Sequence, residues 1–335
     1  MTGAAGPPVP SSGLHHDALL YDHDLGYRDA IRDFVAAGRA AGEPVLVAVP
    51  GHRLALVRPL LDPLDEVECA DMAVIGRNPA TIIPAVLDGF ARRFPGRPLR
   101  FVGESLWPGR RPAAYRHCVE HEAMINLGFA GQPFTARCLF DRIRLPADTL
   151  ADVTAAHPWL CSGGAARPNP GYRPPRAVLD RLAVPLPPPP DDALTVPVTP
   201  DGFAALRTAV AAVASTAGLA AERVDDLRIV VTELASNALT HGTGQSAARC
   251  WAAAGELVCE VTGPGELADP MAGRVPPAPT SVRGRGLLLV QRLGDLVDIR
   301  VADGTTTVRV RLDLPAPGGS AADPAEGRLV GPAPL

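Results

Sequence analysis

The sequence contains no lysine, so every strongly basic side chain in it is an arginine. A Walker-type phosphate loop, and any other mechanism that needs a lysine amine, is therefore excluded. There is no basic tract and the formal net charge is −4, which argues against direct binding of nucleic acid. The chain also lacks an apolar run long enough to span a bilayer, and its N-terminus lacks a basic-then-apolar signal pattern. These absences predict a cytoplasmic protein with no membrane segment.

Cys-x-x-Cys pairs are absent as well. The six cysteines are scattered along the chain, at Cys69, Cys118, Cys138, Cys161, Cys250 and Cys259. This distribution predicts reduced and mostly buried thiols. A zinc site is not excluded, but no local spacing points to one, and the single cluster of metal-ligating residue types is Cys118 with His117, Glu120 and His121.

A length of 335 residues suggests about two domains. Proline, glycine and small residues dominate both ends, so we predict disordered tails over 1–13 and 315–335. A polyproline run predicts a semi-rigid linker over 179–199. The expected domains are therefore residues 14–178 and 200–314.

The first domain alternates strand-like and helix-like segments. A short apolar run at 44–50 is typical of a strand buried on both faces. Further strands are expected over 66–70, 99–103 and 135–141, and helices over 27–41, 79–93, 113–127 and 145–156. This α/β alternation predicts a mostly parallel sheet with helices on both faces.

The turn after the apolar run is where a nucleotide-binding α/β domain would place its phosphate loop, and the Gly-Lys-Ser/Thr sequence is missing there. The domain resembles a MEDS-type sensory domain, which is a RecA-like relative without the catalytic loop. That resemblance implies a sensory role. The residues that carry it are those at 15–21, 76–79 and 100–104, Trp107, and His121 with Glu122.

Several polar residues of this domain have simpler interpretations. Residues 121–126 begin like a zincin motif, but Ile125 stands where the second histidine is required. His121 could also be a histidine-kinase phosphoacceptor, yet no dimerising helical hairpin leads into the second domain. We therefore expect His121 and Glu122 to form a surface pair, and the pairs His15–His16 and Arg110–Arg111 to be solvated.

In the second domain, residues 230–242 predict one helix that ends at Gly242. Glu233, Asn237 and His241 recur at intervals of four and therefore share a face. A carboxylate one turn before a carboxamide suits a magnesium–triphosphate site, because the amide oxygen can ligate a hard cation and the carboxylate can deprotonate a hydroxyl. By itself, the same spacing also fits an amphipathic helix with a solvated polar stripe.

The segment Glu233-Leu-Ala-Ser-Asn237-Ala-Leu-Thr-His241-Gly242 closely resembles the N-box of the GHKL ATPase superfamily, in its anti-sigma-factor serine-kinase branch. About fifty residues later, Arg283-Gly-Arg-Gly286 resembles the family's second glycine box, where backbone amides hold phosphates. The resemblance covers roughly 200–314. It implies a Bergerat-type α/β two-layer sandwich that binds ATP and Mg²⁺, with a sigma factor or its STAS-type antagonist as partner. This branch commonly forms homodimers.

The resemblance also implies roles for individual residues. Glu233 would be the general base and Asn237 the magnesium ligand. His241 of the N-box would also bind nucleotide. The other nucleotide-binding positions would be Gly263 and Gly265 in the first glycine box, and Gly284, Arg285 and Gly286 in the second. Around these motifs, we expect a helix starting at 199–201, a hairpin of strands 245–254 and 256–262, and a second hairpin of strands 296–301 and 306–312.

One family feature is missing from the sequence. The first glycine box normally begins with an aspartate that hydrogen-bonds the adenine amino group, and here that position holds Val261 or Gly263, depending on the alignment. Loss of this contact could weaken binding by roughly 1–3 kcal/mol. The domain could therefore be an ATP-dependent serine/threonine kinase that phosphorylates an antagonist, or a partner-binding module that no longer needs nucleotide. A sensor histidine kinase is a third, weaker interpretation.

Overall fold

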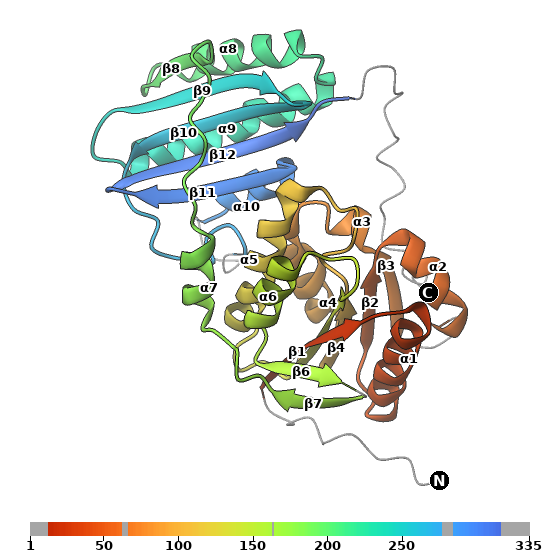
Figure 1. Ribbon diagram of the computed structural model, residues 1–335. Coiled ribbons are helices and arrows are strands. Elements are labelled where there is room, and N and C mark those ends of the chain that lie inside the picture. The colour runs from red at the N-terminus through yellow and green to blue at the C-terminus, as the bar shows by residue number, and fades with distance from the viewer. Residues whose placement is uncertain (1–12, 62–65, 163, 277–283, 316–335) are drawn as a thin grey trace, which may run out of the picture. The chain divides into compact units, whose positions relative to one another are not determined.

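The structure is a computed structural model that describes residues 13–61, 66–162, 164–276 and 284–315 (Figure 1). The chain divides into two compact units, with the boundary between Leu182 and Ala183. The tails expected at 1–13 and 315–335 fall almost wholly outside the described residues. Among the described helices, none has the length and apolar character needed to cross a membrane.

The first unit is built on a seven-stranded sheet in the order β3-β2-β4-β5-β1-β6-β7. All neighbouring strands are parallel except β6 and β7. The prediction of a mostly parallel sheet is therefore confirmed. The strands are β1 (Leu14–Tyr21), β2 (Val45–Val49), β3 (Val67–Asp71), β4 (Leu99–Gly103), β5 (Phe134–Asp141), β6 (Trp159–Ser162) and β7 (Ala165–Pro168).

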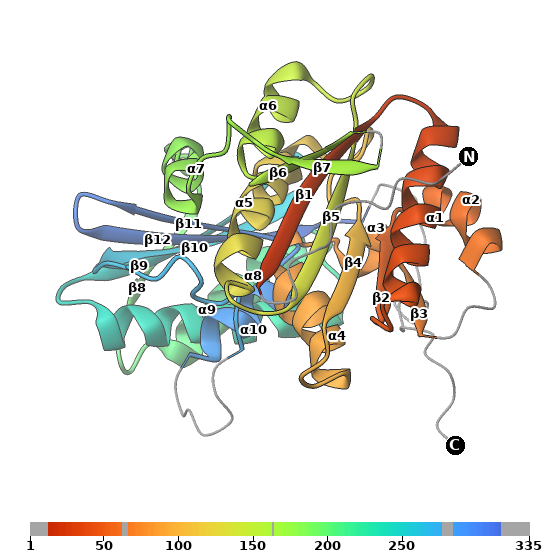
Figure 2. The same cartoon turned by 90° about the horizontal axis from the view of Figure 1, so that it is seen from below.

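Helices cover this sheet on both sides: α1 and α2 lie on one side, and α5 and α6 on the other (Figure 2). The single helix expected over 79–93 is instead a 3₁₀ turn, a π-helical stretch and α4 in succession, and Pro84 in the π stretch has no N–H to donate. The helices are α1 (Asp24–Ala40), α2 (Gly51–Leu61), α3 (Met72–Ile75), α4 (Asp88–Arg93), α5 (Pro112–Gly128), α6 (Ala147–Ala155) and α7 (Pro175–Leu182).

Five polar residues that were expected at the surface of this unit are buried: His15, His16, Arg110, His121 and Glu122. The expectation was wrong because β1, which carries both adjacent histidines, is a central strand between β5 and β6. Arg110 is held by backbone carbonyls, and its guanidinium donates to the oxygens of Ser105 (2.9 Å) and Gly76 (2.6 Å).

The turn after β2 gives a structural reason for the missing phosphate loop. Helix α2 begins at Gly51, directly after the turn. A Cβ atom added at Gly51 would lie 2.5 Å from Oδ2 of Asp71, so a carboxylate already occupies the space beside this turn. That negative charge would repel a phosphate group.

The second unit is a two-layer sandwich, as predicted. Its five antiparallel strands have the order β11-β12-β10-β9-β8, and side chains of all three helices join the apolar core with one face of the sheet. The elements are β8 (Leu194–Val198), α8 (Phe203–Thr216), α9 (Ala221–His241), β9 (Ser246–Ala253), β10 (Glu256–Pro264), α10 (Gly286–Leu293), β11 (Leu296–Ala302) and β12 (Thr305–Asp313).

Both expected hairpins are present. The β9–β10 turn has positive φ at Ala254 (51°) and Gly255 (78°), and the β11–β12 turn has positive φ at Asp303 (50°) and Gly304 (69°). Two-residue turns of this kind match the twist of the paired strands. The helix expected from 199–201 starts later, at Phe203, because Thr199 accepts a turn hydrogen bond from Gly202 N (3.0 Å).

The segment expected as a linker over 179–199 has more structure than a spacer. Its first residues end α7, and its last residues form β8 at the edge of the second sheet. Between them, the carbonyls of Val184 and Pro187 accept hydrogen bonds from Arg300 (3.0 Å) and Arg309 (2.8 Å). The proline-rich stretch is thus fastened across the face of the sheet that the helices leave open (Figure 1).

Candidate functional site

Helix α9 places the N-box residues at the edge of the second unit's core. Its apolar residues Val230, Leu234 and Ala235 are at most 2% exposed, which fixes the rotation of the helix about its axis. Glu233 and Asn237 are therefore half-buried on the adjoining face, while His241, in the last turn, is exposed. Within the described residues, the side chains of Glu233 and Asn237 make no hydrogen bond or ion pair, so their oxygen atoms are available to a ligand.

The second glycine box meets the N-box at Gly286. A Cβ atom added to Gly286 would lie 2.6 Å from Oε2 of Glu233 and 3.5 Å from Nδ2 of Asn237. Gly286 is also the first residue of α10, so unpaired backbone N–H groups of a helix N-terminus lie beside these two side chains. The structure thus brings together two motifs that are about fifty residues apart in the sequence.

The other residues of the second box border this point. Gly284 has a φ of +92°, a backbone conformation that favours glycine. Arg285 is exposed and occupies the N-cap position of α10. The segment between the two boxes is described only up to residue 276, and residues 277–283 lie outside the described part of the chain.

The first glycine box lies against the end of α9. A Cβ atom at Gly242 would be 2.9 Å from the carbonyl oxygen of Pro264, and one at Gly265 would be 3.3 Å from that of His241. Gly265 also has a φ of +139°. These glycines allow two backbone segments to approach closely, which a side chain at either position would prevent.

Ser246 is a polar residue at this end of the site that the sequence did not single out. Its Oγ would lie 2.1 Å from a Cβ added at Gly263, one of the two positions to which the family's aspartate aligns. Ser246 is 6% exposed, and its hydroxyl has no hydrogen-bond partner among the described residues. A lone serine has no distinctive sequence pattern, so only the pairing of β9 with β10 could reveal it.

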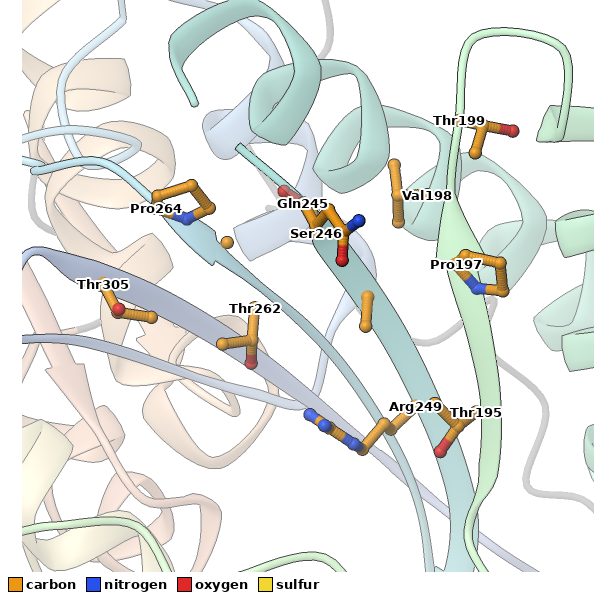
Figure 3. Close-up of a pocket in the computed structure, with 12 residues that line it drawn as sticks. Thr195, Pro197, Val198, Thr199, Gln245, Ser246, Arg249, Thr262, Pro264 and Thr305 are labelled. Atoms are coloured by element: carbon orange, nitrogen blue, oxygen red, sulfur yellow. The ribbon is translucent and has the colours of Figure 1, made fainter. Parts of the chain in front are cut away.

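A cavity of about 680 Å³ lies beside this end of the site (Figure 3). It reaches Ser246, Gly263 and Pro264, but none of its lining residues belongs to α9 or α10. The cavity is therefore distinct from the meeting point of Glu233 and Gly286. Its lining is Thr195, Pro197, Val198, Thr199, Gln245, Ser246, Ala247, Arg249, Thr262, Gly263, Pro264 and Thr305.

Comparison with known proteins identifies both units. The family model for MEDS, the methanogen/methylotroph DcmR sensory domain, matches residues 15–158. The family model for the histidine kinase-like ATPase domain matches residues 196–312. No curated protein matches the chain.

Among solved structures, the crystal structure of the RsbU and RsbW domains of Rv1364c from Mycobacterium tuberculosis is similar to part of the chain. The match has 19% sequence identity and a TM-score of 0.28, and it covers 40% of this chain. It covers 36% of the solved chain, so this protein matches about a third of that one.

Proposed function

Because the chain pairs a MEDS sensory domain with a histidine kinase-like ATPase domain, we propose that it is an anti-sigma-type regulator. The first domain senses a ligand, and the second binds a sigma factor or its STAS-type antagonist. Support for this partner class comes from the N-box, whose sequence closely resembles that of the anti-sigma branch. A homodimer is part of the same expectation.

We further propose that the second domain binds ATP with Mg²⁺. The main support for this proposal is the close approach of Gly286 to the side chains of Glu233 and Asn237. The residues present fit the ion, because an amide oxygen and a carboxylate without partners among the described residues are hard ligands of the kind Mg²⁺ takes. Asn237 would ligate the ion, and the α10 N-terminus would hold phosphates. Glu233 would accept the proton of a serine or threonine hydroxyl on the antagonist.

At the end of the site where the adenine base is expected, Ser246 is the group best placed to replace the missing aspartate. Its buried hydroxyl can both donate and accept a hydrogen bond, and it is unpartnered among the described residues. A neutral hydroxyl makes a weaker contact than a carboxylate, so we expect affinity for ATP to be lower than an aspartate would give.

The first test is calorimetric titration of Mg²⁺-ATP into the full chain. We expect binding in the micromolar range, with Asn237→Ala weakening it at least tenfold, or about 1.4 kcal/mol, through loss of the ion's ligand. Thr240→Ala, at an exposed position on the same helix, serves as the control and should bind like the parent chain. No binding at millimolar ATP would favour the second candidate function, a partner-binding module that does not use nucleotide.

Gly286→Ala should separate nucleotide binding from folding. The added methyl group would displace the carboxylate of Glu233, which is the end of a flexible side chain, so the backbone need not move. Alanine also favours helix more than glycine does, and we expect no loss of thermal stability. Affinity for Mg²⁺-ATP should fall at least about tenfold.

The matched control for this substitution is Gly89→Ala in α4, where an added Cβ atom meets no atom within 4 Å. It should leave binding unchanged and should raise stability by no more than about 1 kcal/mol, the helix preference of alanine over glycine. If Gly286→Ala bound Mg²⁺-ATP as tightly as the parent chain, the phosphates would not lie at the start of α10.

Kinase activity is tested separately with a STAS-type antagonist as substrate. Glu233→Gln keeps the shape of the side chain but cannot accept the hydroxyl proton, so phosphate transfer should drop by about 10²-fold or more. Mg²⁺-ATP binding should remain. Transfer at the parent rate would show that Glu233 is not the general base.

A further inference from the structure

Four side chains that are far apart in the sequence meet inside the first unit: His16, Glu122, Cys138 and His157. His16 lies on β1, Cys138 on the neighbouring strand β5, Glu122 on α5, and His157 just after α6. All four are at most 2% exposed. Each offers one nitrogen, oxygen or sulfur atom to the cluster, and these atoms all lie within 4.8 Å of one another.

Three of the six separations between these ligand atoms match the edges of a tetrahedral metal site, and the other three are at most 4.8 Å. Nε2 of His16 is 3.4 Å from Sγ of Cys138 and 3.5 Å from Oε2 of Glu122, and Nε2 of His157 is 3.5 Å from the same Oε2. Zinc bonds of about 2.0–2.3 Å at tetrahedral angles place neighbouring ligand atoms about 3.3–3.8 Å apart. An ion could therefore bind with only small side-chain movements.

Hydrogen bonds outside the cluster set the tautomers of both histidines. Nδ1 of His157 lies 2.6 Å from the carbonyl oxygen of Val153, which can only accept, so this nitrogen carries the proton. Nδ1 of His16 lies 3.1 Å from Oδ1 of Asn126. The Nδ2 atom of Asn126 donates to the carbonyl of Ala156 (2.9 Å), which fixes the orientation of the amide and makes its oxygen the acceptor. In the neutral rings, both Nε2 atoms therefore direct lone pairs into the cluster, as metal-binding histidines do.

Glu122 is held in the same way. Its Oε1 accepts a hydrogen bond from the hydroxyl of Ser105, which leaves Oε2 facing the histidines. Among the described residues, Oε2 of Glu122 and Nε2 of His157 have no hydrogen-bond partner. Buried polar atoms of a folded protein rarely remain unpaired, and a bound metal ion would give both atoms a partner.

We propose that His16, Glu122, Cys138 and His157 bind one Zn²⁺ ion in a closed, four-ligand site. Imidazole and thiolate ligands in a tetrahedral arrangement favour zinc over magnesium or calcium. The Glu122 carboxylate and the Cys138 thiolate together cancel the ion's two positive charges, so the occupied site buries no net charge. Formation of the sulfur–zinc bond breaks the S–H bond of Cys138, and that proton leaves to solvent.

With four protein ligands, the site has no open position for a substrate and is of the structural type. The ion would join β1, β5, α5 and the segment after α6, which are elements from the middle of the sheet and from one of the layers that cover it. Zinc binding therefore stabilises the folded first unit, because the unfolded chain does not hold the ligands together.

The test uses the full chain without a polyhistidine tag, since a tag would bind metal itself. We expect the purified protein to retain one zinc ion per chain, measured by inductively coupled plasma mass spectrometry. After the zinc is removed by chelation, titration with Co²⁺ should give a sulfur-to-cobalt charge-transfer band that saturates at one equivalent. Removal of the metal should lower the melting temperature of the first unit by about 5 °C or more.

Cys138→Ala should abolish the charge-transfer band and the effect of chelation on melting. Cys161→Ala, at another buried cysteine of the same sheet, is the control and should retain both. Circular dichroism would verify that each variant is folded. Folded parent protein that contains no zinc and gives no cobalt band would overturn the proposal, and so would a band that survives Cys138→Ala.

Discussion

Replacing Arg309 with methionine is expected to destabilise the second unit by about 3 kcal/mol, because it leaves the charge of Glu260 buried without its main partner. Nε and Nη2 of Arg309 lie 2.9 Å and 2.6 Å from Oε2 of Glu260, and both residues are at most 4% exposed. Arg249, whose Nη1 is 3.5 Å from the other carboxylate oxygen, compensates only in part. Methionine keeps most of the side-chain length over the ring of Trp251, so the loss is mainly electrostatic.

Hydrogen exchange of β10 and β12 in the full chain measures this free energy without interference from the first unit. Arg292→Met, at an exposed position on α10, is the control and should change stability by no more than about 0.5 kcal/mol. Combining Arg309→Met with Glu260→Gln should restore part of the loss, since no unpaired charge remains. A loss below about 1 kcal/mol for Arg309→Met alone would show that Arg249 is sufficient to balance Glu260.

Arg309 also contacts the proline-rich stretch that precedes β8. Nη2 of Arg309 also donates to the carbonyl of Pro187, so the ion pair helps to hold the proline-rich stretch on the sheet. A sequence read residue by residue presents that stretch as a spacer, because its composition predicts extended chain and nothing local indicates what it contacts. Its contacts depend on strand register in residues more than a hundred positions away.

Patterns within short stretches of sequence predicted the helices, hairpins and strands that depend on nearby residues. The four-residue spacing in α9 predicted that Glu233, Asn237 and His241 lie on one side of the helix, and the strand patterns predicted both hairpins. The strand–helix alternation predicted the parallel sheet of the first unit.

The buried polar residues of the first unit could not be predicted in this way. His16 sits two positions from the N-terminal end of its strand, and adjacent histidines near a terminus are usually solvated. The four residues of the proposed zinc site come from four separate segments, so their spacing resembles no metal-binding motif. Cys118, around which the sequence grouped His117, Glu120 and His121, is not part of the metal-binding cluster found among the described residues, and its Sγ donates to the carbonyl of Ser105 (3.2 Å).

The contribution of Glu104 to the stability of the first unit should fall as the pH rises from 5 to 8. This residue follows β4 and is fully buried, and burial raises the pKa of its carboxyl from 4.5 to about 7, even though Tyr21, Tyr27 and Arg53 favour the charged form. The folded chain therefore holds a proton that the unfolded chain releases above pH 4.5. The resulting stabilisation is complete below pH 4.5 and is lost as the pH rises through 7, which at 1.36 kcal/mol per pKa unit amounts to about 3 kcal/mol.

Glu104→Gln isolates this contribution, because glutamine has the shape of the protonated side chain and does not titrate. Contributions from the histidines are common to both chains and cancel in the comparison. Urea unfolding in a Trp251→Phe background reports on the first unit, since the remaining tryptophans, Trp107 and Trp159, both belong to it. The two chains should have similar stability near pH 5, and the variant should be more stable by about 3 kcal/mol at pH 8. Parallel pH profiles would mean that Glu104 is ionised in the folded protein throughout this range, with the two tyrosine hydroxyls and Arg53 outweighing the cost of its burial.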